Sequence, residues 1–149
     1  MTYADQLQRL LDLGLPGLAN ATEDDLSGWV AELPAVPGGV LAVHPDLAPA
    51  SALAPLLRRA GKPGFVVHDM GDLDEFRPTP DITLPERPLY VVTDLDRGDD
   101  MLNWSPEEAA PVIAQRGRTP LTINEGISWL LQEPDRLEPN RCFMCIGSR

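Results

Sequence analysis

The sequence has few cysteines and no long hydrophobic run. Its 149 residues include two cysteines, Cys142 and Cys145, which excludes a framework of disulfides and favours a reducing compartment. No segment approaches the roughly 18 consecutive apolar residues of a membrane-spanning helix, and residues 1–15 carry charges where a signal peptide would be apolar. We therefore expect a cytoplasmic protein that does not bind membranes.

Basic residues are also scarce. Lys and Arg together number 12 against 23 Asp and Glu, which gives a formal net charge of -11. Lys62 is the only lysine, and Arg58-Arg59 is the only pair of adjacent basic residues. Because nucleic acids and anionic membrane surfaces attract clustered Lys and Arg, we expect neither of them as a partner.

The common catalytic and nucleotide-binding motifs are missing. The sequence has no Gly-x-Ser-x-Gly nucleophile turn, no phosphate-binding loop ending in Gly-Lys-Ser/Thr, and no Gly-x-Gly-x-x-Gly dinucleotide motif. These absences favour a protein that binds over one that catalyses.

Short apolar runs alternate with helical patterns along the chain. Apolar residues at helical spacing predict helices at 3–13, 22–33, 53–60, 105–117 and 122–133, so residues 1–34 form a helical segment. Apolar runs bounded by turn residues predict buried strands at 40–43, 64–67, 89–92 and 142–146. A strand, helix and strand with short links form a right-handed parallel unit. We therefore expect one α/β domain over residues 1–149, with a small, mostly parallel sheet of about four strands and helices on its faces, preceded by two N-terminal helices.

Residues 69–88 depart from this pattern. They contain four prolines and little apolar periodicity, which predicts a long, semi-rigid, acidic loop. The surrounding segment, residues 64–100, holds ten acidic residues against three arginines, or seven of the eleven net negative charges. An acidic surface of this kind attracts a cation or a basic partner.

Both histidines and several carboxylates follow the predicted strands. His44 follows the first strand, His68 and Asp69 follow the second, and Asp94 and Asp96 follow the third. If the strands are parallel, these groups meet at one edge of the sheet. Asp69, Asp94 and Asp96 are then candidate ligands of Mg²⁺ or Mn²⁺, with His68 or His44 as a general base. The alternative is that they are solvated residues of polar loops.

The pair Cys142-x-x-Cys145 has a redox, a zinc and a structural interpretation. Its apolar neighbours indicate a strand rather than the helix start on which redox pairs lie, and a zinc site needs two further ligands. We therefore expect buried structural thiols. Trp104, just before a predicted helix, and Trp129, off the apolar stripe of its helix, would each mark an interface if exposed. The alternative is partial burial against a neighbouring loop, which is the more frequent outcome.

Several motifs in the second half of the chain resemble an actinobacterial family of uncharacterised proteins, mainly over residues 88–149. They are Tyr90–Asp99, Leu102–Ala109, Gly117–Thr122, Glu125-Gly126, Cys142–Met144 and Gly147–Arg149. The family is a domain of unknown function, so the resemblance implies no activity. The resemblance implies that members continue beyond the last motif into a Trp- and Gly-rich tail, whereas this sequence stops at Arg149. If a strand is missing here, we expect an open sheet edge and pairing with a second chain.

Three functions follow from these patterns. The first is a non-catalytic cytoplasmic binding protein that uses the acidic surface around residues 64–100, with a partner protein or a second copy in a homo-oligomer. The second is a small metal-dependent hydrolase with an Asp/His site at the carboxyl ends of the strands. The third is a carrier with an apolar pocket at the same edge.

Overall fold

The computed structural model describes residues 1–149 as six α-helices and four short strands joined by loops and 3-10 turns. The helices are α1 (Tyr3–Asp12), α2 (Leu15–Ala19), α3 (Glu23–Ala31), α4 (Ala50–Leu53), α5 (Pro106–Gln115) and α6 (Ile123–Gln132). The strands are β1 (Val40–Val43), β2 (Arg58–Arg59), β3 (Lys62–Pro63) and β4 (Leu89–Val92). The 3-10 turns are η1 (Ala54–Leu56), η2 (His68–Met70), η3 (Leu73–Glu75), η4 (Asp99–Met101) and η5 (Pro134–Arg136).

The longer helices begin where hydroxyl side chains cap them. Thr2, Thr22 and Thr122 each accept a hydrogen bond from the amide three residues later, and the acidic side chain at that position binds back to the threonine amide. Ser105 caps α5 through the amide of Glu108. These bonds satisfy amides that the first helical turn leaves free, and the predicted helices starting at residues 3, 22, 105 and 122 are confirmed.

The prediction of a mostly parallel sheet of about four strands was wrong. The structure has two separate two-stranded sheets, and both are antiparallel: β1 with β4, and β2 with β3. In the first sheet, Val40 lies opposite Val92 and Val43 lies opposite Leu89. The fold is still a mixture of helices and strands.

The error arose between residues 44 and 88. A parallel connection needs a crossover of roughly a dozen residues or more, usually an α-helix, but α4 ends at Leu53 and the chain turns back through the β2–β3 hairpin. The expected strand at 64–67 does not form, and the Phe65 side chain is 77% exposed. Residues 142–146 also form no strand.

Side chains replace a third strand along the outer edge of β1. The side-chain amide of Gln6 donates through Nε2 to the Gly39 carbonyl (2.9 Å), and its Oε1 accepts from the Leu41 backbone amide (2.8 Å). Ser128 accepts from the Val43 amide (3.0 Å), and Asn124 donates to the Val43 carbonyl (3.0 Å). Gln6, Asn124 and Ser128 are all buried, so helices α1 and α6 cover this edge and also satisfy its polar groups.

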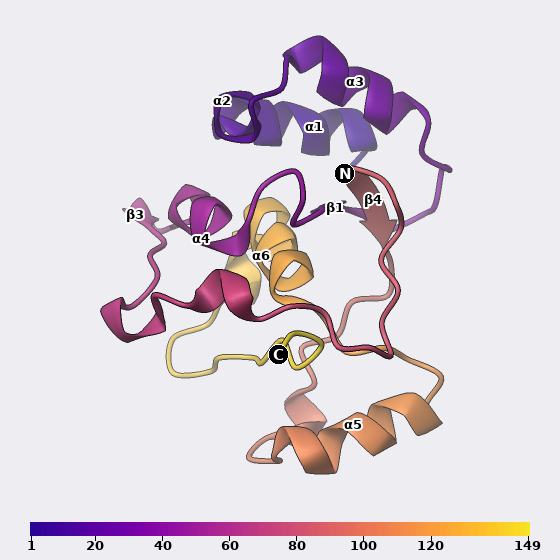
Figure 1. The fold of residues 1–149 in the computed structure, drawn as a ribbon, viewed down its shortest axis with the longest axis vertical. Coiled ribbons are helices and arrows are strands. Elements are labelled where there is room, and N and C mark those ends of the chain that lie inside the picture. Colours follow the sequence, from indigo (N-terminus) through magenta and orange to yellow (C-terminus); the bar gives the residue numbers. More distant parts are fainter.

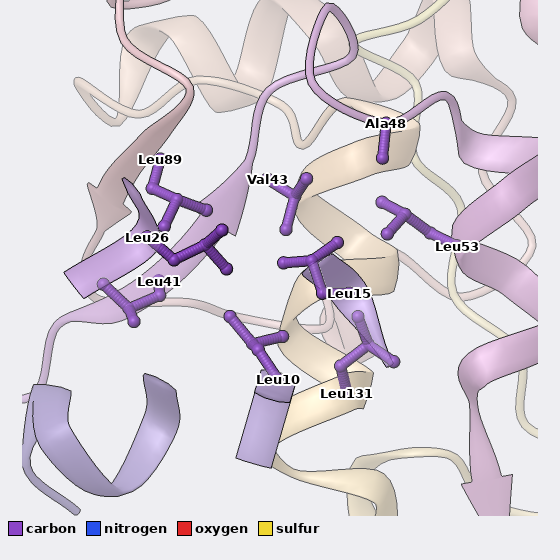
Figure 2. Close-up of a cluster of buried hydrophobic side chains, with 9 residues drawn as sticks. All are labelled: Leu10, Leu15, Leu26, Leu41, Val43, Ala48, Leu53, Leu89 and Leu131. Carbon is purple, nitrogen blue, oxygen red and sulfur yellow. The ribbon is translucent and has the colours of Figure 1, made fainter. Parts of the chain in front are cut away.

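The hydrophobic core lies between these helices and the first sheet. Figure 2 shows its nine side chains, which α1, α2, α3, β1, α4, β4, α6 and the loop at residue 48 contribute. They are Leu10, Leu15, Leu26, Leu41, Val43, Ala48, Leu53, Leu89 and Leu131.

Helix α5 lies apart from this core. In Figure 1 it occupies the end of the molecule opposite α1 and α3, and Ala109 is its only buried residue. The loop at residues 69–88 contains 3-10 turns. It packs against the C-terminus, where Arg77 and Arg149 exchange two backbone hydrogen bonds. None of the helices has the length and apolar character needed to cross a membrane.

Candidate binding groove

The antiparallel pairing separates the histidine and carboxylates that were expected to share an edge. His44 follows β1, and its amide donates to the Pro88 carbonyl at the start of β4 (2.9 Å). Asp94 and Asp96 follow the other end of β4. Because paired antiparallel strands end at opposite sides of a sheet, the predicted common edge does not exist.

The remaining predicted site residues are dispersed. His68 and Asp69 lie exposed in the 3-10 turn η2. The Asp94 carboxylate pairs with Arg118 (Oδ2 to Nη1, 2.6 Å), and Asp96 accepts a hydrogen bond from the Gly98 amide (2.7 Å). No three His, Cys, Asp or Glu side chains are arranged to hold a metal ion.

A large hollow lies between α5 and the C-terminal segment. It has a volume of about 680 Å³, and we call it the 92–146 groove. Its wall consists of residues 92–106, Ala109 and Ile113 of α5, residues 116–121, Glu125 of α6, and residues 142–144 and 146. Most of the groove wall therefore consists of loop residues, and the helical and strand patterns of the sequence do not predict how loops are arranged.

Three arginines in the groove wall each form an ion pair with an aspartate. Arg118 pairs with Asp94 at 2.6 Å, Arg116 pairs with Asp100 at 2.8 Å, and Arg97 pairs with Asp99 at 3.4 Å. The wall contains five carboxylates and three guanidinium groups. Two carboxylates, those of Asp96 and Glu125, therefore have no guanidinium partner.

Arg97 joins the two loops of the groove. Its buried guanidinium donates to the backbone carbonyls of Arg136 and Arg141 and lies over the Phe143 ring, 5.4 Å from the ring centre. Such contacts hold the C-terminal segment against residues 93–104. Arg97 is not among the predicted site residues, because the atoms that it binds are backbone carbonyls about 40 residues away.

Glu125 lies at the inner wall of the groove in a buried polar cluster. The Tyr90 hydroxyl donates to Glu125 Oε2 (3.0 Å), and the Thr122 amide donates to Oε1 (2.9 Å). Burial, and then the negative charge of Glu125, raise the pKa of Tyr90. The same two causes raise the pKa of the Cys145 thiol to about 12, so this thiol is protonated at neutral pH.

Exposed hydrophobic side chains gather along the groove. Leu102 is 68% exposed, Met144 is 63% exposed and Trp104 is 39% exposed, and all three line it. Cys142, which also lines the groove, is exposed, whereas Cys145 lies largely covered beside Gly126. The prediction of two buried thiols is therefore wrong for Cys142 and is met only in part by Cys145, which is partly buried.

Comparison of the chain with known protein families identifies the family to which it belongs. The model of a family of unknown function, DUF5701, matches residues 9–149. The chain belongs to DUF5701. The predicted resemblance to a family of uncharacterised proteins is thus confirmed, and the DUF5701 match extends it across the core as well as the groove. No curated protein and no solved structure matches this DUF5701 chain.

Proposed function

We propose that this DUF5701 chain is a non-catalytic binding protein whose 92–146 groove holds a short segment of a partner protein. The observation that carries the proposal is the presence of Leu102, Trp104 and Met144, all substantially exposed, in one groove. A cluster of exposed apolar side chains beside charged groups is typical of an interaction site, and a tryptophan in such a place is a frequent source of binding energy.

The charge of the protein supports a basic partner. In the acidic segment 64–100, arginines pair with Asp94, Asp99 and Asp100, whereas the other seven acidic residues are in no ion pair. These are Asp69, Asp72, Asp74, Glu75, Asp81, Glu86 and Asp96. Such unpaired charges attract a basic partner over a distance and speed its association, while apolar contacts in the groove hold it.

The other parts of the predicted function have less support. The metal-dependent hydrolase required a common strand edge, so we do not propose it. We place the protein in the cytoplasm, in keeping with two cysteines that form no disulfide.

Selection from a library of random peptides tests the groove. Peptides selected on the unmodified protein should lose at least about tenfold in affinity, or about 1.4 kcal/mol, when Leu102→Asp or Met144→Asp is introduced, measured by fluorescence anisotropy. Val67→Asp is the matched control, because Val67 is 52% exposed and lies outside the groove. Equal loss in all three variants, or no selected peptide, would contradict the proposal.

Sedimentation velocity of the protein without peptide separates a partner from self-association. The proposal of a separate partner requires a groove that is open without peptide, in a monomer or in a homo-oligomer that Leu102→Asp leaves intact. The pairing of two chains stays a prediction. A dimer that Leu102→Asp dissociates would make a second copy of the chain the occupant of the groove and would overturn the proposal of a separate partner.

A further inference from the structure

The charge left over in the groove falls on two carboxylates in different surroundings. Asp96 is exposed to solvent, whereas Glu125 is only 9% exposed. Water and salt screen an exposed carboxylate, so a contact with it contributes little to binding. A carboxylate in a buried position interacts much more strongly with a charge that reaches it.

No group within the protein neutralises Glu125. Its hydrogen-bond donors, the Tyr90 hydroxyl and the Thr122 amide, are both neutral, and none of the ion pairs in the structure includes it. The N-terminus of α6 supplies roughly half a positive charge, which leaves a net negative charge in the wall. Burial of such a charge without a counter-ion is unfavourable.

The neighbours of Glu125 respond to this charge. It adds to the effect of burial in raising the pKa of both Tyr90 and Cys145. These two groups therefore stay protonated and cannot serve as an alternative anion in this part of the groove. Glu125 is the one buried carboxylate among the five that line the groove.

We propose that Glu125 selects the ligand of the groove by pairing with the guanidinium or ammonium group of an arginine or lysine side chain in the bound segment. This inference rests on the proposed function, because it assigns the chemistry of the segment that the 92–146 groove holds. The apolar part of the segment contacts Leu102, Trp104 and Met144, and its basic side chain reaches inward to Glu125. The pair replaces the counter-ion that the protein itself lacks.

The variant Glu125→Gln isolates the charge. Glutamine is accepted at the same position of a capping box, because its amide oxygen can accept from the Thr122 amide as Oε1 of Glu125 does. Its NH2 group can then donate to the Tyr90 hydroxyl oxygen in place of the present bond, so we expect α6 to form normally. Random peptide libraries are selected in parallel on the unmodified protein and on Glu125→Gln. We expect one position enriched in arginine or lysine on the unmodified protein, and no such enrichment on the variant.

Replacement of that arginine by citrulline, which is neutral and has nearly the same shape, completes a double-mutant cycle. Citrulline should weaken binding to the unmodified protein at least about tenfold, or about 1.4 kcal/mol, and should have little further effect on Glu125→Gln. Two controls remove one charge elsewhere: Asp96→Asn in the exposed part of the groove and Glu86→Gln outside it. Both should change binding less than threefold and keep the citrulline effect.

The outcomes distinguish the two proposals. If selected peptides bind the groove but citrulline costs the same on Glu125→Gln as on the unmodified protein, the role of Glu125 is wrong and the binding function stands. If Leu102→Asp and Met144→Asp leave binding unchanged, or no peptide is selected, both proposals fall. Equal losses for Glu125→Gln and Glu86→Gln would show a general effect of net charge and would also overturn the role of Glu125.

Discussion

The outer edge of β1 and the 92–146 groove are two places where helix α6 presents polar side chains to other parts of the chain. At the β1 edge, Asn124 and Ser128 bind backbone groups of the strand, and all of these atoms are buried. Glu125 is the next residue in the helix after Asn124, but it lines the groove and has no counter-ion. The same helix therefore closes one surface and leaves the other open.

This difference separates stability from binding. At the β1 edge, the Gly39 carbonyl, the Leu41 amide and both backbone groups of Val43 bind buried side chains, so removal of those side chains should destabilise the fold. In the groove, exposed apolar side chains and the carboxylates of Asp96 and Glu125 have no counterpart within the protein, so substitutions of the exposed groove residues should alter binding with little effect on folding. The predictions below test this division in order of expected effect.

Leu41→Ala should lower the free energy of unfolding by about 4 kcal/mol, within the range for large-to-small changes in a core. Leu41 is fully buried in the cluster of Figure 2. Leu102→Ala makes the same change at a groove residue and should shift stability by no more than about 0.5 kcal/mol. Urea denaturation measures both, and similar losses would erase the distinction between core and groove.

Gln6→Leu should cost about 2–3 kcal/mol, because it leaves the Leu41 amide and the Gly39 carbonyl without a hydrogen-bond partner. Gln8→Leu is the matched control on the same helix, since Gln8 is exposed and binds only Asp12. The control should stay within about 0.5 kcal/mol of the unmodified protein. If both variants unfold at the same urea concentration, the side chains do not seal the edge of β1.

Gly126→Ala should destabilise the protein by about 1–2 kcal/mol through crowding at the boundary between α6 and the groove. A methyl group at residue 126 would lie 2.3 Å from Cys145 Sγ. Gly28→Ala in α3 meets no atom within 4 Å and should stabilise by roughly 0.5–1 kcal/mol, the usual gain for alanine in a helix. Addition of Cys145→Ala should recover most of the loss in Gly126→Ala, as thermal unfolding would show; no recovery would place the strain elsewhere.

The smallest effect concerns pH. The pKa of Cys145 is about 12 in the folded protein against an ordinary value of 9.0. The unfolded chain therefore releases its proton first as pH rises, and the stability present below pH 9 declines above it. At pH 10 the loss should be about 1 kcal/mol, and Cys145→Ala should remove this part of the decline. An identical pH dependence in the variant would contradict the raised pKa.

The sequence predicted the helices better than the sheet. Thr22, Ser105 and Thr122 mark helix starts through hydrogen bonds to amides two or three residues away, so local sequence suffices. The strand prediction at 64–67 failed because an apolar run does not show whether other elements will cover it, and Phe65 and Val67 are exposed. Strand direction failed for a similar reason, since it depends on where the chain turns between residues 44 and 88.

The candidate site shows the same limit more sharply. The prediction that its carboxylates and histidines lie together assumed parallel strands. Because β1 and β4 pair antiparallel, these residues lie apart. Trp104 and Trp129 were the predicted interface markers if exposed; Trp104 is 39% exposed and lines the groove, whereas Trp129 is buried. Glu125 was visible in the sequence only as a capping residue, because nothing local reveals that it also faces a hollow.

By itself, the sequence determined the acidic charge, the capped helices and the apolar segments that form the core, because these properties depend on residue types and on neighbours within one or two helical turns. Tertiary structure alone decided that Gln6, Asn124 and Ser128 would replace a strand and that arginines would neutralise Asp94, Asp99 and Asp100. Most of these contacts join residues far apart in the chain. Only the folded arrangement therefore shows which charge, that of Glu125, is left for a partner.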